Sequence, residues 1–397
     1  MEVELKQHGV LQGAVEDTAR MSRAELLYLG SSLIGIALLL PLRTIAVYGA
    51  AMTGVFAISL LRLPRWGRVI LTTALLGMLL FALHYVPHPY LSWALWNGAG
   101  LKAFFLLRSF DYALSQAPER QSGGKWSVRV GQFLLYMTFL PTLFGGPVLT
   151  VSDFYRSYHP DRRPTFDAIL KHFIKIGWGA LKFYLLTPVL IQSAERLVQF
   201  GLDGAGGALQ YFSLMGYAAL FMVAFIIYFS GFTDMAIGVS RLLRFELYEN
   251  FQHPLLASSP LEFWKRSNIS VYRWLMTHVF YPCWRHDQLV LKVATVFLVS
   301  GLWHCALLRN FQPLPVALML FAMLLNGLSV LIVMRFQRGQ RIPKAPAPPR
   351  ATWGIRAAQV AVTFAFIAMV HQLFWAGLRP ALIPTNLLVL KKLLGIA

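Results

Sequence analysis

The stretch SGLWHC, Ser300–Cys305, closes an apolar run from Leu289 to Leu308 that is long enough to enter a lipid bilayer. A polar side chain inside a bilayer is unfavourable, so His304 requires a hydrogen-bond partner, a water-filled cavity or a chemical role. Neutral imidazole accepts a proton readily near neutral pH, which makes His304 a candidate general base. The structural alternative is a hydrogen bond to a neighbouring group, for instance Ser300 one turn earlier.

The composition places the chain among integral membrane proteins. Of its 397 residues, 57% are hydrophobic and 13% are charged. The net charge of +19 would suit a nucleic-acid-binding protein in a soluble chain, but cytosolic basic linkers explain it here, and we expect no nucleic-acid partner. Cys283 and Cys305 fit no disulfide or zinc pattern, and the histidines lack the spacing of metal ligands. We therefore expect neither a metal nor a bound cofactor.

Apolar runs of membrane-spanning length recur along the chain, which predicts an all-α membrane protein with about 9–11 membrane helices. The predicted spans are Ala24–Leu42, Thr44–Leu61, Val69–Tyr85, Tyr90–Leu107, Ala168–Gln192, Ala208–Ser230, Leu289–Leu308, Leu314–Met334 and Ile355–Leu378. Arginine and lysine collect in the linkers after the second, fourth and eighth of these spans, and the positive-inside rule places those linkers in the cytosol. Residues 1–23 are polar and lack the features of a cleaved signal, so we expect a cytosolic lead-in.

The segment Gly131–Val151 breaks this simple alternation, because it is apolar but has basic residues on both sides. Inside it, Pro141, Gly145, Gly146 and Pro147 interrupt any helix. A re-entrant hairpin accounts for both facts, and non-helical backbone at membrane depth must then line protein or a cavity. A kinked full span is the alternative.

The stretch from Gly231 to Gln288 mixes apolar patches with charge. Helical spacing of apolar residues over Met235–Leu247 predicts a helix that lies in the interface or packs inside a funnel. Ser258 or Ser259, followed by Pro260 and an acid at Glu262, predicts the start of another helix.

Several polar residues of this stretch are candidates for the site. Asn268 carries an amide that can donate to a developing oxyanion, although helix capping or a turn is the ordinary explanation for an asparagine. For Asn268 to meet His304, its segment has to penetrate the membrane.

Asp234 is either a buried acid that orients other groups or a helix-end residue at the cytosolic surface. The candidate substrate-binding residues are Asp234, Trp264, Lys265, Arg266, Arg273 and Trp303; the cations would hold donor phosphates, but positive-inside anchoring predicts the same charges.

The combination of YMTFLPTLFGGPV (Tyr136–Val148), YFSGFTDMAIGVSRLLRF (Tyr228–Phe245), NFQHPLLASSPLEFWKRSNIS (Asn250–Ser270) and SGLWHC resembles the membrane-bound O-acyltransferase family, in particular the bacterial branch that modifies envelope polymers. The resemblance implies a many-helix fold around a funnel, in the cytoplasmic membrane. It also implies that His304 matches the family's catalytic histidine and removes a proton from an acceptor hydroxyl. On this basis we expect Asn268 and His304 to be the catalytic residues.

The resemblance leads to an expected reaction: acyl transfer, with acetyl as the acyl group, from a cytosolic thioester to a hydroxyl of an extracytoplasmic polysaccharide. The donor, acetyl-CoA or an acyl carrier protein, is a co-substrate. The expected partners are membrane lipids, the donor or carrier protein, the glycan acceptor and a periplasmic or extracellular acyltransferase. We expect a lead-in over residues 1–23, N-terminal membrane helices over 24–130, a catalytic core over 131–308 and C-terminal membrane helices over 309–397.

The chain departs from the bacterial branch where FWRRWHIS is usual, because FWKRSNIS puts Asn268 in the place of a histidine. Other branches that acylate lipids, sterols or proteins commonly carry asparagine there, so the substitution leaves the substrate open. The alternatives are D-alanyl transfer to teichoic acid and fatty-acyl transfer to a lipid or protein. A transporter or acyl-passing channel is an alternative of another class, although no inverted repeat supports it.

Overall fold

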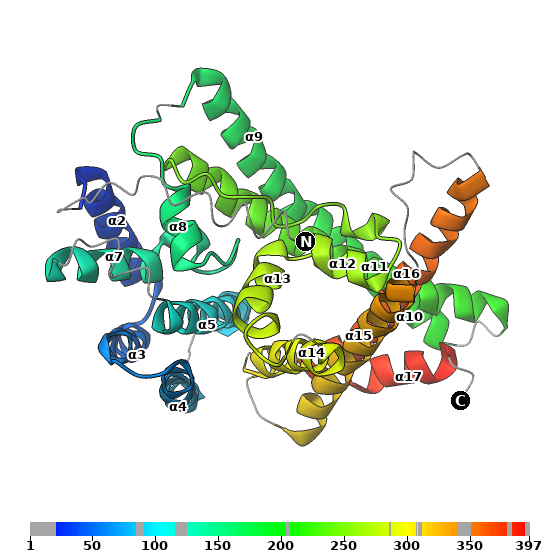
Figure 1. The fold of residues 1–397 in the computed structure, drawn as a ribbon. Helices are drawn as coiled ribbons and strands as arrows, with labels where there is room; N and C mark the ends of the chain where they lie inside the picture. The colour runs from blue at the N-terminus through cyan, green and yellow to red at the C-terminus, as the bar shows by residue number, and fades with distance from the viewer. Residues whose placement is uncertain are drawn as a thin grey trace. The chain divides into compact units, whose positions relative to one another are not determined.

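The computed structural model describes residues 21–84, 91–115, 125–162, 164–203, 207–285, 287–306, 308, 312–339, 351–378 and 383–393. Within these ranges the regular elements are helices, and the only β pairing is an isolated antiparallel bridge between Tyr158 and Phe245 (Figure 1). The all-α prediction is therefore confirmed. Most of the predicted lead-in, residues 1–20, and the basic linker over 340–350 lie outside the described residues.

Each predicted span forms a helix. They are α2 (Arg23–Leu39), α3 (Leu42–Leu60), α4 (Arg65–His84), α5 (Leu91–Leu114), α9 (Phe166–Leu181) with α10 (Thr187–Leu202), α11 (Ala208–Leu242), α14 (Leu289–Cys305), α15 (Pro313–Gly339) and α16 (Ala351–Leu378). Five helical stretches of the described chain are both long and apolar enough to cross a membrane: Leu42–Leu60, Phe166–Leu202, Ala208–Leu242, Pro313–Gln337 and Trp353–Ala376. The chain is therefore a multi-pass membrane protein by length and composition of its helices.

The chain divides into two compact units. The first comprises Met1–Val86, Arg108–Leu140 and Thr150–Arg156, and the second comprises Pro87–Leu107, Pro141–Leu149 and Ser157–Ala397. Within the first unit, a buried polar contact ties α5 to α7 (Trp126–Thr138), because Tyr136 donates its hydroxyl to Asp111 Oδ2 at 3.0 Å. The same carboxylate oxygen accepts the backbone N–H of Val151, the first residue of α8 (Val151–Ser157), at 2.6 Å.

The predicted interruption of Gly131–Val151 is present. Helix α7 ends at Thr138, a 3-10 turn follows over Leu140–Thr142, and residues 143–150 form no helix before α8. Proline and glycine at these positions remove a backbone donor and lower helix stability, which accounts for the break. The re-entrant path of this segment through a membrane stays a prediction.

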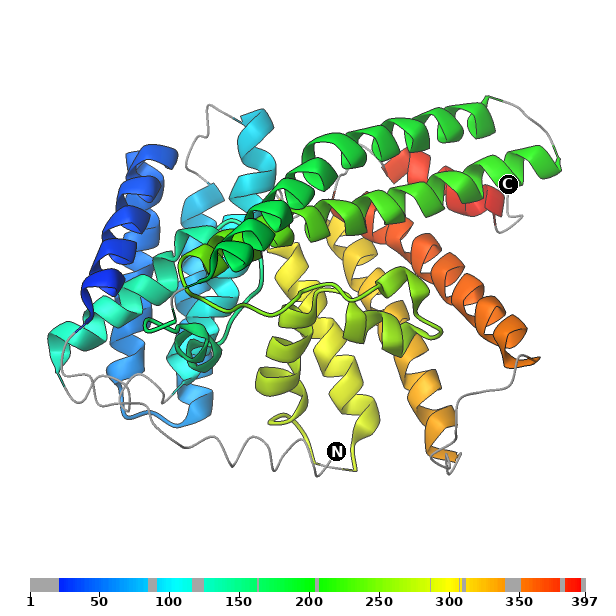
Figure 2. The ribbon, with the colours of Figure 1, turned by 90° about the horizontal axis from the view of Figure 1, so that it is seen from above.

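In the second unit, α9 and α10 form one rod, joined by a π-helical turn over Lys182–Leu186, and this rod runs beside α11 (Figure 2). The separate helix predicted over Met235–Leu247 does not form. Residues up to Leu242 continue α11, which has 35 residues, because no proline interrupts them and Gly231 packs against α9. Only after Leu242 does the chain leave the helix.

Four short turns and helices follow α11 and lead to the apolar helix α14: η3 (Pro254–Leu256), α12 (Pro260–Arg266), α13 (Ile269–Leu275) and the π-helical η4 (Met276–Phe280). The predicted helix start is confirmed, since Ser259 is the N-cap of α12 and its hydroxyl accepts the Glu262 N–H at 3.2 Å. Helices α14, α15 and α16 then pack side by side in chain order, and α17 (Ile383–Leu393) packs on α16 (Figures 1 and 2).

Candidate functional site

Helix α14 carries His304 close to its C-terminal end. One turn earlier, Gly301 faces α15 so closely that a Cβ there would lie 2.9 Å from Leu320 Cδ2. Ser300 is buried on the same side, with its hydroxyl 3.9 Å from the Met323 sulfur. The SGLWHC stretch therefore places small residues at the contact with α15, which brings this end of α14 close to its neighbour.

The hydrogen bond of His304 fixes the proton on its ring. Nδ1 lies 2.7 Å from the backbone carbonyl oxygen of Ser300. A carbonyl oxygen only accepts, so an uncharged imidazole bonded in this way carries its hydrogen on Nδ1 and presents an unprotonated Nε2. The structural alternative for His304, a hydrogen bond to Ser300, engages Nδ1 alone. Nε2 remains able to accept a proton.

Two aromatic side chains hold the His304 ring. The Trp303 ring lies 4.5 Å from it, centroid to centroid, and the Phe374 ring of α16 meets it edge-on at 5.0 Å and 86°. Trp303 is itself anchored, because its indole N–H donates to the Ala103 carbonyl at 3.0 Å. The half-buried imidazole thus contacts two aromatic rings, and its hydrogen bond to the Ser300 carbonyl sets its orientation.

A second histidine lies nearby on α16 and was not among the predicted site residues. His371 is buried, its Nδ1 lies 3.0 Å from the Ile367 carbonyl oxygen, and its ring contacts the same Phe374 at 5.8 Å. An uncharged His371 ring therefore also carries its hydrogen on Nδ1, as that of His304 does. No sequence signal identifies His371, because its position near His304 depends on tertiary packing.

Asn268 is the N-cap of α13, but its side chain makes no capping hydrogen bond. The residue has left-handed backbone angles, φ 51° and ψ 53°, which asparagine adopts more readily than most residues. Its side-chain oxygen accepts a hydrogen bond from Asn250 Nδ2 at 3.0 Å. The amide of Asn268 is therefore held by another side chain rather than used as a cap.

Asn250 is a buried neighbour of Asn268 that sequence reasoning did not single out. Its side chain is buried, and its Oδ1 accepts the backbone N–H of Ser270 at 2.8 Å. Its backbone carbonyl accepts the N–H of Ile269 at 2.9 Å. The loop around Asn250 is thus bound to the start of α13, directly beside Asn268.

Asp234 is a buried acid, as one of its two interpretations proposed. Its carboxylate lies 2.6 Å from Lys182 Nζ and 2.9 Å from Lys175 Nζ, so both oxygens are engaged by cations of the neighbouring rod. Lys175 also reaches Glu249 at 2.8 Å. The two lysines were not predicted, and the alternative of a helix-end residue at the surface is wrong.

The remaining candidates have different surroundings. Lys265 is exposed, and Arg273 is exposed with its guanidinium 4.7 Å from the Tyr248 ring centroid. Arg266 pairs with Glu262 at 2.5 Å on the same helix. Trp264 is half-buried, lies 5.8 Å from the Phe297 ring, and its indole N–H has no acceptor among the described residues.

The second unit contains all of these candidates, but they form separate groups. Trp303 contacts His304, and Asn268 contacts Asn250, whereas no hydrogen bond joins His304 to Asn268 in the described part of the chain. The catalytic pairing of Asn268 with His304 therefore stays a prediction.

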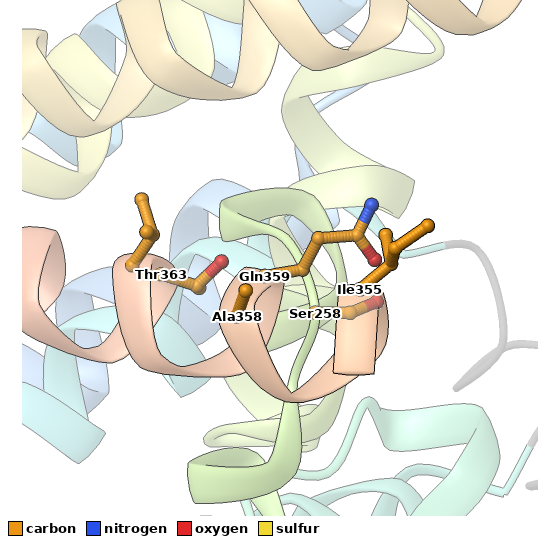
Figure 3. A pocket seen from close by; sticks show the side chains of 6 residues that line it. Ser258, Ile355, Ala358, Gln359 and Thr363 are labelled. Carbon is orange, nitrogen blue, oxygen red and sulfur yellow. The ribbon is translucent and has the colours of Figure 1, made fainter. Parts of the chain in front are cut away.

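A shallow hollow of about 390 Å³ lies between Ser258 and one face of α16 (Figure 3). Its lining consists of Ser258, Ile355, Ala358, Gln359, Val362 and Thr363. Neither His304 nor Asn268 lines it, and the Ser258 hydroxyl donates to the Glu262 carboxylate at 2.7 Å as part of the start of α12. The candidate site therefore comprises the surroundings of His304 and Asn268 and excludes this hollow.

Comparison with known proteins gives a consistent result. Residues 64–343 match MBOAT, the membrane-bound O-acyltransferase family. The chain is 27% identical over 178 residues to the probable alginate O-acetylase AlgI of Pseudomonas fluorescens, a match that covers 44% of this chain and 34% of that relative. It is 26% identical over 186 residues to the peptidoglycan O-acetyltransferase of Helicobacter pylori, which covers 44% of this chain and 33% of the relative.

A third relative is named for another activity. The chain is 24% identical over 207 residues to the teichoic acid D-alanyltransferase of Streptococcus thermophilus, and the match covers 48% of this chain and 49% of the relative. The matched segments thus span between a third and a half of the length of these curated relatives.

Proposed function

The chain belongs to the membrane-bound O-acyltransferase family, and from this membership and the geometry at His304 we propose that it transfers an acetyl group from a cytosolic thioester to a hydroxyl of an extracytoplasmic glycan. The observation that carries the proposal is the bond from His304 Nδ1 to the Ser300 carbonyl, 2.7 Å long, which leaves Nε2 as a base. The cytoplasmic membrane is the proposed location, since a thioester donor is made in the cytosol.

In the proposed reaction, Nε2 of His304 takes the proton of the acceptor hydroxyl while its oxygen attacks the thioester carbonyl carbon. The resulting tetrahedral intermediate collapses, the carbon–sulfur bond breaks, and the thiolate takes the proton back from the imidazolium. The products are an O-acyl ester and a free thiol. General base catalysis of this kind is worth about 10²–10⁴ in rate.

Asn268 is proposed to stabilise the negative charge that forms during the reaction. Its amide nitrogen is a hydrogen-bond donor for the carbonyl oxygen of the acyl group, which gains negative charge in the intermediate. A donor of this kind, fixed in advance, is typically worth about 10²–10³ in kcat. Trp264, Lys265, Arg266 and Arg273 are proposed contacts of the donor or acceptor.

The names of the relatives support the choice of substrate. The probable alginate O-acetylase and the peptidoglycan O-acetyltransferase are both named for the acetylation of a glycan, and each is slightly more identical to this chain than the teichoic acid D-alanyltransferase. We propose D-alanyl transfer as the second candidate, because the teichoic acid D-alanyltransferase is similar to this chain over a comparable length. A carrier or an extracytoplasmic acyltransferase is a proposed partner in either case.

The test is the mass of the acyl group that mild base releases from the envelope glycans of cells with and without the chain. Loss of acetate in the absence of the chain supports the leading proposal, loss of D-alanine supports the second, and loss of a fatty acid contradicts both. An unchanged envelope contradicts acyl transfer to these glycans.

The role of His304 is tested by complementing the same cells with His304→Ala. We expect the released acyl group to fall to the level of cells without the chain, while the protein remains in the membrane at normal abundance. The matched control is His159→Gln, which removes an exposed histidine outside the site and should restore the full amount. Normal acylation by His304→Ala would contradict the base and favour a channel that passes the acyl group.

A further inference from the structure

We propose that Asn250 is a positioning residue that fixes the amide of Asn268 with its N–H groups turned outward, so that position 268 acts only as a hydrogen-bond donor to the substrate. The inference rests on the proposed function, because the acceptor of this hydrogen bond would be the acyl carbonyl oxygen. It adds a residue, Asn250, and a defined orientation to the site.

The first step is the orientation of Asn250 itself. A backbone N–H can only donate, so the side-chain atom 2.8 Å from the Ser270 nitrogen must be the oxygen of the Asn250 amide. The Asn250 Nδ2 is then the opposite end of the same group. Since the side chain is 2% exposed, water does not compete for these positions.

The second step follows from the first. Asn250 Nδ2 lies 3.0 Å from the side chain of Asn268 and has to donate, so the atom that faces it is the Asn268 oxygen. The Nδ2 of Asn268 is therefore turned away from Asn250. It has no acceptor among the described residues, and the side chain is half-buried, so a ligand can reach it.

The backbone around the two asparagines keeps this arrangement rigid. Gln252 donates its N–H to the Arg266 carbonyl at 2.9 Å, and Ile269 donates to the Asn250 carbonyl at 2.9 Å. These two bonds join the loop after α11 to both sides of Asn268. The amide is thus oriented before any substrate binds, which is the condition for effective oxyanion stabilisation.

Substitutions between amide and carboxylate test the orientation, because they change the donors without changing size. In Asn268→Asp, the carboxylate still accepts from Asn250 but can no longer donate outward. In Asn250→Asp, the carboxylate still accepts from Ser270, and Asn268 has to rotate its amide to donate inward, which turns its oxygen outward. Both variants keep the internal hydrogen bond and lose the outward donor.

The first measurement is thermal unfolding of the purified full-length chain in detergent at pH 8, and it does not depend on activity. Each single variant should unfold within a few degrees of the original chain. The double variant Asn250→Asp with Asn268→Asp places two carboxylates face to face, and its unfolding temperature should fall by more than the sum of the two single shifts. Additive shifts would overturn the contact.

The second measurement is the transfer of labelled acetyl from acetyl-CoA to glycan in membranes that contain the full chain. Asn268→Asp and Asn250→Asp should each lower kcat about 100-fold with little change in KM. Asn268→His should keep kcat within about tenfold, because a histidine that accepts from Asn250 at Nδ1 carries its proton on Nε2 and still donates outward. The matched control is Gln252→Glu, the same chemical change at an exposed side chain of the same loop.

The outcomes separate this inference from the proposed function. If Asn250→Asp transfers acetyl as fast as Gln252→Glu, the positioning role is overturned although the chain remains an acyltransferase. If His304→Ala transfers at the normal rate, the proposed base is wrong, and the unfolding measurements still decide the contact between Asn250 and Asn268. If the original chain transfers no acetyl group, the proposed reaction and the donor role of Asn268 are both overturned.

Discussion

Gly179 and Gly231 bring the backbones of α9 and α11 into direct contact. A Cβ on Gly179 would lie 2.6 Å from the Gly231 carbonyl oxygen, and a Cβ on Gly231 would lie 2.7 Å from the Gly179 carbonyl oxygen. This crossing lies next to the ion pair of Lys182 and Asp234, whose atoms are 2.6 Å apart. The absence of two side chains at the crossing therefore allows a buried charge to be neutralised from the neighbouring helix.

We predict that Gly179→Ala destabilises the protein by about 1–3 kcal/mol, because the methyl group meets backbone that cannot move aside. The matched control is Gly177→Ala on the same helix, where an added Cβ has no atom within 4 Å. That variant should be neutral or more stable, since alanine is favoured over glycine in helices by about 1 kcal/mol. Thermal unfolding in detergent measures both, and equal shifts would mean that the crossing is not close.

We predict that Asp234→Asn lowers the free energy of unfolding by about 3 kcal/mol, because it leaves the half-buried ammonium group of Lys182 without a carboxylate and leaves Lys175 with Glu249 alone. The control is Asp167→Asn, which removes the partner of Lys171 in a pair whose side chains are 71% exposed. That pair should contribute less than about 1 kcal/mol. Comparable losses in the two variants would contradict the burial of Asp234.

Local signals in the sequence predict much of the fold. Apolar runs of the right length predict the helices, and Ser259, Pro260 and Glu262 predict where α12 begins, because a helix start depends on residues within one turn. The break after Thr138 follows in the same way from nearby prolines and glycines. The same reasoning fails for Met235–Leu247, where the packing of Gly231 against α9 allows the helix to continue.

The surroundings of the site residues depend on contacts that the sequence does not encode locally. Asn250 and Asn268 are 18 positions apart, Lys182 and Asp234 are 52 apart, and Trp303 and Ala103 are 200 apart. A residue type indicates that such a side chain needs a partner, as for His304 and Asp234. Which partner it meets follows from tertiary packing, so Asn250, Lys182 and His371 could not be predicted.

We predict that Trp303→Phe lowers acyl transfer about tenfold or more, because it keeps a ring beside His304 but removes the hydrogen bond to the Ala103 carbonyl that holds the ring in place. The control is Trp274→Phe, which removes an equivalent indole bond, to the Leu107 carbonyl at 3.1 Å, from a ring that contacts His278 rather than His304. Each variant should lose about 1 kcal/mol of stability. Transfer assays at normal protein abundance distinguish them, and an equal loss of activity would show that Trp303 acts only through stability.

The start of α12 provides a prediction about pH, because Glu262 lies outside the membrane-spanning helices. Burial alone would raise the pKa of its carboxyl, but hydrogen bonds from the Ser258 hydroxyl and N–H, with the charges of Arg266 and Arg356, lower it below the ordinary 4.5. A lowered pKa in the folded state means that the ionised carboxylate stabilises the fold above pH 4.5 and that this contribution is lost as the pH falls through the folded pKa.

We therefore predict that Glu262→Gln lowers the unfolding temperature at pH 7, and that its difference from the original chain shrinks as the pH is lowered through 4.5. Ser259→Ala is the matched control, because its hydroxyl caps the same helix and does not titrate in this range. It should cost about 1 kcal/mol at every pH. A Glu262→Gln difference that stays constant with pH would show that the side chain contributes through packing rather than through its charge.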